Sequence, residues 1–196
     1  AITLNTRLLD GVQRKGSTGT VRGWAHIIQA GLMYQVNDLE SAWRETNITI
    51  ELEKQTGSLP DVELRLFGLL TKLELLRGDE SAARHAASEL IIRMKRGGVT
   101  NAIDRADSIY AELMFRLEDW SAFDAWARTY RPPQQPLFFP YRLATLMYAQ
   151  FLTRQKAWDE GRRLVEEQAR LAYEAGYVEY EMELGIVRAI LEMEAG

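Results

Sequence analysis

The hydrophobic positions of this chain recur with a spacing of about forty residues. We number the repeat from one small or apolar reference position in each copy: Ala42, Ala83, Phe123 and Gly161. Two apolar columns keep this register, at fourteen and at ten residues before each reference: Ile28, Leu69, Ile109 and Met147, then Leu32, Leu73, Leu113 and Phe151. Positions four apart share a helical face, so this pattern predicts stacked pairs of antiparallel helices.

Short polar segments between the paired helices predict tight turns. The first three turns contain Asn37-Asp38, Gly78-Asp79 and Glu118-Asp119, whereas the fourth contains Gln155-Lys156. An aspartate at the end of such a turn can accept a bond from a free amide in the first turn of the next helix. We therefore expect capped second helices in three hairpins and a poorly capped one in the fourth.

The turns and breaks divide the chain into four hairpins and a final helix. We predict the hairpins at about 20–56, 60–96, 100–130 and 138–175, and the last helix at 177–195. A further helix is expected at 3–14, which gives nine to ten helices. No alternation of period two persists, so the expected fold is all-α, and 1–196 is expected to form a single helical-repeat domain.

Composition narrows the possible partners and location. The chain has 24 Lys and Arg against 28 Asp and Glu, and an acidic chain repels phosphate, so no direct nucleic acid contact is expected. It has no cysteine, which suits a reducing cytoplasm. No stretch approaches the ~20 apolar residues that cross a bilayer, so a soluble, cytoplasmic protein without membrane contact is expected. The chain starts without Met inside a leucine-bearing helix, as a fragment of a larger multidomain protein would.

Motifs that carry catalysis or metal binding are missing from the sequence. The two histidines, His26 and His85, have no ligand spacing, and neither a phosphate-binding loop nor a nucleophile elbow occurs. We therefore expect no catalytic residue, no metal ligand and no cofactor, and we expect that the protein is not an enzyme. An all-helical enzyme would require a cleft with strongly perturbed titratable groups.

Aromatic residues gather in the third and fourth hairpins, around a proline-rich segment: Trp120, Trp126, Tyr130, Phe138, Phe139, Tyr141, Tyr148 and Phe151. Such residues usually pack between helices, although an aromatic-walled cleft can also bind a small molecule or peptide. For that second possibility, seven residues are candidates to line a concave groove: Arg22, His26, Gln29, Lys72, Tyr110, Arg142 and Tyr148. The mixed-sign run Arg162, Arg163, Glu166, Glu167 and Arg170 is typical of a solvated outer face.

Several segments resemble a known family. The chain is similar to the tetratricopeptide-like (TPR-like) region of MalT-like transcriptional regulators of the LuxR group. The segments that carry the similarity are the turn Asn37–Ala42 after a helix with Gly31 and Tyr34, the turn Gly78-Asp79, the segment Phe151–Gly161, and the runs Leu164–Gly176 and Glu181–Ala189. The resemblance implies a right-handed superhelix that senses an effector. It also implies that the ATPase and DNA-binding modules lie outside this chain.

Two functions follow as hypotheses. The first is an effector-sensing and protein-interaction segment of a MalT-like LuxR-family regulator, with a small-molecule effector, a protein or a peptide in the concave groove and the other domains of the parent regulator as partners. The alternative is a general TPR-like scaffold that binds proteins or peptides and is not linked to transcription. A phosphate loop upstream in the gene and a helix-turn-helix downstream would distinguish the first from the second.

Overall fold

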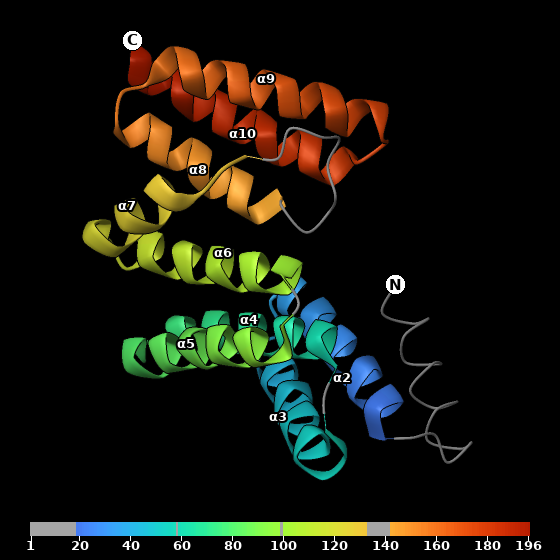
Figure 1. Ribbon diagram of the computed structural model, residues 1–196. Coiled ribbons are helices and arrows are strands. Elements are labelled where there is room, and N and C mark those ends of the chain that lie inside the picture. Colours follow the sequence, from blue (N-terminus) through green and yellow to red (C-terminus); the bar gives the residue numbers. More distant parts are fainter. Residues whose placement is uncertain (1–18, 58, 99, 133–141) are drawn as a thin grey trace. The chain divides into compact units, whose positions relative to one another are not determined.

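The computed structural model describes residues 19–57, 59–98, 100–132 and 142–196. Within these ranges the chain forms nine helices and no strand, which confirms the all-α prediction. Figure 1 shows them in chain order: α2 (Gly19–Gln35), α3 (Leu39–Thr56), α4 (Pro60–Leu76), α5 (Glu80–Gly97), α6 (Thr100–Arg116), α7 (Trp120–Thr129), α8 (Arg142–Arg154), α9 (Trp158–Glu174) and α10 (Val178–Ala195). The right-handed sense of the superhelix stays a prediction.

The predicted hairpins correspond to consecutive helix pairs. Helices α2 and α3 fill the first hairpin and pack against each other, as α4 and α5 do in the second. Helices α6 and α7 occupy the third, α8 and α9 the fourth, and α10 is the final helix. The helix predicted at 3–14 and the start of the fourth hairpin at 138–141 lie outside the described residues.

Contacts along the chain define two compact units. The first unit ends at Ala106 and the second begins at Asp107, so the boundary falls within α6. The single domain expected for 1–196 stays a prediction, and each unit is described by itself below.

Five turns between helices share one backbone geometry. In the first, the amide of Asp38 donates to the carbonyl of Met33 at 2.9 Å, and that of Asn37 donates to Tyr34 at 3.0 Å. This pair of bonds is a Schellman motif, which places one residue in the left-handed region. In the five turns this residue is Asn37 (φ 61°), Gly78 (79°), Glu118 (55°), Lys156 (59°) and Gly176 (72°).

The caps that follow these turns agree with the sequence prediction. The carboxylates of Asp38, Asp79 and Asp119 accept bonds from the amides of the residues three positions later. In the fourth hairpin the corresponding residue is Ala157, which offers no side-chain bond. Among the second helices of the four hairpins, α9 is therefore the one that lacks a side-chain cap, as expected.

The reference positions of the repeat lie in the core. Ala42, Ala83 and Phe123 are fully buried, and Gly161 is buried as well. Gly161 packs so closely against α10 that a side chain there would meet Leu191. A Cβ atom at Gly161 would lie 2.9 Å from Cδ2 of Leu191 on α10.

An unbroken series of ring contacts joins α6, α7 and α8 in the second unit. Phe115 meets Trp120 and Phe123, and stacked or tilted rings continue from Phe123 through Trp126, Tyr130 and Tyr148 to Phe151. The Arg154 guanidinium lies 3.6 Å from the ring centroid of Trp120. Five of the eight aromatic residues that the sequence analysis singled out thus pack on other aromatic rings: Trp120, Trp126, Tyr130, Tyr148 and Phe151. The other three, Phe138, Phe139 and Tyr141, lie outside the described residues.

Candidate functional site

The seven residues predicted to line a groove fall into both units. Arg22, His26 and Gln29 lie on α2 and Lys72 on α4, in the first unit. Tyr110 lies on α6, and Arg142 and Tyr148 lie on α8, in the second unit. Residues that share a helix have different surroundings. Arg22 lines a groove, whereas His26 and Gln29 are buried. Tyr148 lines a pocket whose lining does not include Arg142.

On α2, two of the predicted residues, His26 and Gln29, are buried within the first hairpin. His26 is buried, and its Nδ1 lies 2.7 Å from Oε2 of Glu45 on α3. Gln29 is also buried, one helical turn further on. A buried imidazole in contact with a carboxylate of the neighbouring helix links the two helices, so the geometry gives His26 a structural contact.

Arg22 instead lines an open groove of about 660 Å³ along α3. The half-buried Arg22 shares the lining of this groove with the apolar residues Trp43, Ile48 and Leu52. The Nε atom of Arg22 is buried without a hydrogen-bond partner. This groove has the mixed apolar and charged lining that suits an extended partner better than a small ligand.

Arg142 on α8 binds residues of α10. Its guanidinium binds the carboxylate of Glu183 and lies 3.2 Å from that of Glu179. It also lies 5.8 Å from the ring centroid of Tyr180. Hydrogen bonds to Glu183 and Glu179 and the charges of these carboxylates raise the pKa of Arg142 above its usual value. The hydrogen bond from Arg142 and its positive charge lower the pKa of Glu179. These ion pairs fasten α10 to α8.

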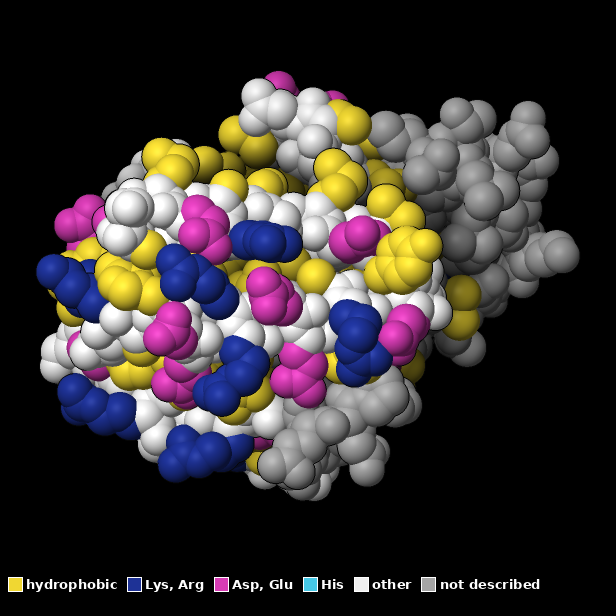
Figure 2. Space-filling view, turned by 90° about the horizontal axis from the view of Figure 1, so that it is seen from above, with side chains coloured by type: hydrophobic (Ala, Val, Ile, Leu, Met, Phe, Trp, Pro, Cys, Tyr) yellow, Lys and Arg dark blue, Asp and Glu magenta, His cyan; other side chains and the backbone are white. Residues whose placement is uncertain are grey.

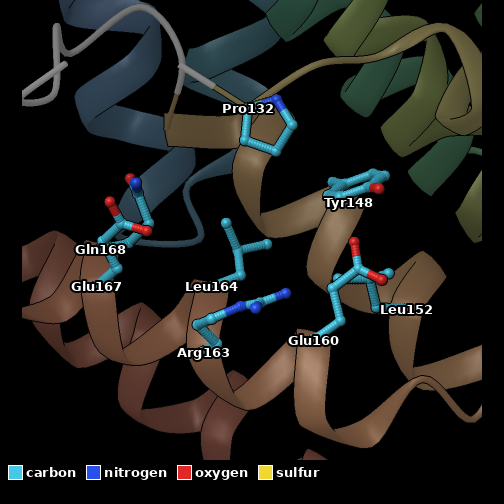
Figure 3. Close-up of a pocket in the computed structure, with 8 residues that line it drawn as sticks. All are labelled: Pro132, Tyr148, Leu152, Glu160, Arg163, Leu164, Glu167 and Gln168. Carbon is cyan, nitrogen blue, oxygen red and sulfur yellow. The ribbon is translucent and has the colours of Figure 1, made fainter. Parts of the chain in front are cut away.

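Tyr148 is the predicted residue that lines a defined pocket in the second unit. The pocket has a volume of about 440 Å³ and lies between α8, α9 and the segment before residue 133 (Figure 3). Its apolar walls come from Pro132, Leu152 and Leu164, with the ring of Tyr148. Polar groups line the remaining wall: Glu160, Arg163, Glu167 and Gln168, all from α9.

The helical spacing of α9 explains why these polar groups converge. Residues 160, 163, 164, 167 and 168 are three or four apart, so they share one face of the helix. In Figure 3 the Glu160 carboxylate rises toward Tyr148, and the Arg163 side chain extends across the pocket below Leu164. Burial, and then the neighbouring Glu160, raise the pKa of Tyr148, so its hydroxyl group keeps its proton and can donate.

Gln168 is the polar residue that stands out in this pocket. Its side chain is 1% exposed, and its Oε1 atom is buried without a hydrogen-bond partner. An unpaired buried amide oxygen costs about 1–3 kcal/mol, which a bound donor would offset. Arg163 and Glu167 are exposed, and among the described residues neither has an ion pair.

Most of this pocket was missed by the sequence analysis. Arg163 and Glu167 belong to the charged run that indicated a solvated outer face, and Figure 2 does show basic and acidic side chains interspersed over the face it displays. The usable signal was Gln168, because it follows Leu164 by four residues within the buried stripe of α9. A polar amide in such a stripe requires a partner.

The comparisons with known proteins add no assignment. No protein-family model and no curated protein matches this chain. None of the helices in the described ranges is long and apolar enough to cross a membrane. The likeness to MalT-like regulators thus rests on the sequence segments given above.

Proposed function

We propose that this chain is an effector-binding segment built of helical repeats, and that the pocket between α8 and α9 is its effector site. The observation that carries the proposal is the buried, unpaired amide oxygen of Gln168 at the wall of a pocket that also presents Arg163. Pockets of about 300–1,000 Å³ with apolar walls and a few convergent polar groups commonly bind small molecules.

The lining indicates a small polar ligand with both donors and acceptors. Arg163 can donate to a carboxylate, a phosphate or a hydroxyl oxygen, whereas Glu160, Glu167 and Gln168 offer acceptors. The faces of Tyr148 and Leu164 can cover an apolar ring or side chain. Sugars and short peptides meet these requirements.

Binding there would bias the packing of α8 against α9. A ligand shifts an equilibrium between helix arrangements only by its difference in affinity for them. Because α9 also packs on α10, the pocket is connected to the last helix of the chain. The finer proposal is that the segment senses an effector within a cytoplasmic MalT-like LuxR-family regulator, and its support is the sequence resemblance.

A second candidate is a scaffold for proteins or peptides unrelated to transcription. The observation that favours it is the open groove of about 660 Å³ on α3, with Trp43, Ile48 and Leu52 along its length. Sequencing the gene on both sides distinguishes the two settings. A phosphate loop upstream and a helix-turn-helix downstream support the regulator, and their absence supports the scaffold.

The effector proposal is tested by a thermal-shift screen of the 196-residue chain against sugars, short peptides and charged metabolites. A ligand at one hundred times its Kd stabilises a protein by about 2.7 kcal/mol, which a melting curve resolves. We expect a compound that raises the Tm of the wild type and loses most of that effect with Gln168→Leu and with Arg163→Ala.

Arg170→Ala is the matched control. Arg170 is another exposed arginine of α9, but it pairs with Glu174 at 2.7 Å and lies outside the pocket lining. This variant should respond to the compound as the wild type does. The proposal fails if no compound stabilises the chain, or if the pocket variants and the control respond alike.

A further inference from the structure

The first helices of the hairpins, α2, α4, α6 and α8, share a buried face that α10 continues. One column of this face lies seventeen residues before each reference position: Ala25, Leu66, Ala106 and Ala144. Leu184 of α10 lies forty residues after Ala144 and continues the column. All five residues are buried. This column fixes the register of α10 as a fifth helix of the same kind, and we call the face that it marks the leading face.

A second column set lies on the opposite side of these helices, which we call the trailing face. It contains the positions fifteen and twelve residues before each reference: Ile27, Gly68, Ser108 and Leu146, then Ala30, Thr71, Ala111 and Ala149. All are buried except Leu146, which is half-buried. In α10 the same register gives Ile186 and Ala189, and both are exposed. Ile186 is 62% exposed, whereas its counterpart Ile27 is 2% exposed.

Each unit shows what a trailing face normally contacts. In the first unit, Ile27 and Ala30 of α2 form one hydrophobic cluster with Val62 and Leu66 of α4. In the second unit, Ala149 of α8 shares a cluster with Leu184 of α10. The trailing face of one helix therefore receives the leading face of the next such helix, and this interface is built in both units.

The trailing face of α10 is continuous and apolar. Val178, Met182, Ile186 and Met193 are each more than half exposed, and Ala189 lies among them. Their spacing of three or four residues, or multiples of it, places them on one side of the helix. A Cβ atom added at Gly185 would have no atom within 4 Å, which leaves room for a close helix approach there. None of the described helices covers this face.

The charge of α10 selects among possible occupants. The helix carries Glu179, Glu181, Glu183, Glu192 and Glu194 against a single basic residue, Arg188. Arg142 of α8 pairs with Glu179 and Glu183, and Arg162 of α9 pairs with Glu192, so five glutamates stand against three arginines and the surroundings stay acidic. Two copies joined through this face would bring these acidic flanks together, and like charges disfavour that contact. A helix with lysine or arginine beside its apolar stripe would complement them.

We propose that the trailing face of α10 is a docking site for a basic amphipathic helix of another protein. The partner helix presents apolar side chains at positions i, i+4, i+7 and i+11, as the leading face of α4 does with Val62, Leu66, Leu69 and Leu73. It takes on α10 the place that α4 takes on α2 and α10 takes on α8. Its basic residues lie beside Glu181, which has no ion pair among the described residues.

A labelled peptide with the sequence of α4, Pro60–Leu76, is the probe, because α4 already packs on a trailing face in this chain. Its acidic residues are replaced (Asp61→Lys, Glu63→Lys and Glu74→Lys), and a scrambled peptide of the same composition is the control. Fluorescence anisotropy with the 196-residue chain should show saturable binding of the ordered basic peptide, weakened severalfold by raising the salt concentration. The unmodified α4 peptide should bind more weakly.

Variants of the chain locate the binding site. The double variant Met182→Ser and Ile186→Ser should raise the Kd at least tenfold, because it removes two exposed apolar side chains from the face. Tyr173→Ser is the matched control, since Tyr173 is 74% exposed on α9. It should leave the Kd unchanged, and both variants should keep the wild-type Tm because the changed residues are exposed.

Four results would overturn this inference. The scrambled peptide could bind as well as the ordered one, or the acidic peptide as well as the basic one. The double variant could bind with the wild-type Kd. Sedimentation could show that the chain forms dimers that the double variant abolishes, in which case the face belongs to a second copy.

Discussion

Gly161 of α9 and Leu191 of α10 meet so closely that a methyl group at position 161 would lie 2.9 Å from Cδ2 of Leu191. Leu191 is itself buried in the cluster that joins α8, α9 and α10. Gly161→Ala gains about 1 kcal/mol of helix propensity. It also overpacks this crossing, at a cost of about 1–3 kcal/mol. We expect the variant to be no more stable than the wild type by urea denaturation.

The same substitution should become stabilising by about 1 kcal/mol when Leu191→Ala removes the opposing side chain. Gly185→Ala on α10 is the control, because no atom lies within 4 Å of its added Cβ. It should be stabilising in the wild type by about 1 kcal/mol. Equal effects of Gly161→Ala with and without Leu191 would show that the two residues do not interact.

The left-handed turn residues predict a second set of effects. Glu118 and Lys156 occupy the position that Gly78 and Gly176 hold in equivalent turns, with φ of 55° and 59°. A side chain in this region costs about 1 kcal/mol, so Glu118→Gly and Lys156→Gly should each raise the free energy of unfolding by up to that amount. Gly78→Ala should lower it by about 1 kcal/mol. Stabilisation by Gly78→Ala would contradict the turn geometry.

Helix capping gives a third prediction, with one loss and one gain. Asp79→Ala removes the bond that the Ala82 amide donates at 2.9 Å and should destabilise the protein by about 1 kcal/mol. Ala157 has a backbone conformation close to that of Asp79 but no side-chain cap. Ala157→Asp should therefore stabilise the start of α9 by about 0.5 kcal/mol or more. Thermal unfolding of both variants measures this, and a destabilised Ala157→Asp would indicate that packing at residue 157 outweighs the cap.

The ion pairs of Arg142 predict a pH dependence. Hydrogen bonding from Arg142 and its charge hold the pKa of Glu179 below its ordinary value of 4.5. A carboxylate whose pKa is lower in the folded protein than in the unfolded chain stabilises the fold at pH values above the unfolded-chain pKa. This stabilisation is lost as the pH falls through the pKa of the folded protein. Arg142→Met should thus destabilise the protein at pH 7, by about 2 kcal/mol for its bonds to both carboxylates, and by less at pH 3.

Arg188→Met is the control for that experiment. Arg188 lies 3.9 Å from Glu166, and both side chains are about 60% exposed. Exposed pairs of this kind contribute about 0–1 kcal/mol, so little change is expected at either pH. If the destabilisation by Arg142→Met were the same at pH 3 and pH 7, the ion pairs would not hold α10 to α8.

Local features of the fold were predictable from the sequence because they depend on neighbouring residues. Asp38, Asp79 and Asp119 cap helices through atoms only three residues away, and Ala157 marks the exception. The repeat register likewise identified the buried reference positions, including Phe123, where ring contacts replace a small side chain.

The site was less predictable because it depends on which helix faces meet. Arg142 was expected to line a groove, but Glu179 and Glu183 of α10 bind it, and those residues lie far along the chain. The exposed face of α10 has the same three- and four-residue spacing as its buried face, so periodicity alone does not separate them. The two faces are distinguished only by the burial of their side chains in the folded chain.

The effector site is tested most directly by methyl NMR of the 196-residue chain, titrated with the first compound that raises its Tm. The proposal predicts that the methyl signals of Leu152 and Leu164, which line the pocket, shift saturably with one Kd, and that Gln168→Leu raises this Kd at least tenfold. The methyl signal of Met193, on the far face of α10, should stay in place. Shifts that leave Leu152 and Leu164 unmoved, or an unchanged Kd in Gln168→Leu, would contradict the assignment of this pocket as the effector site.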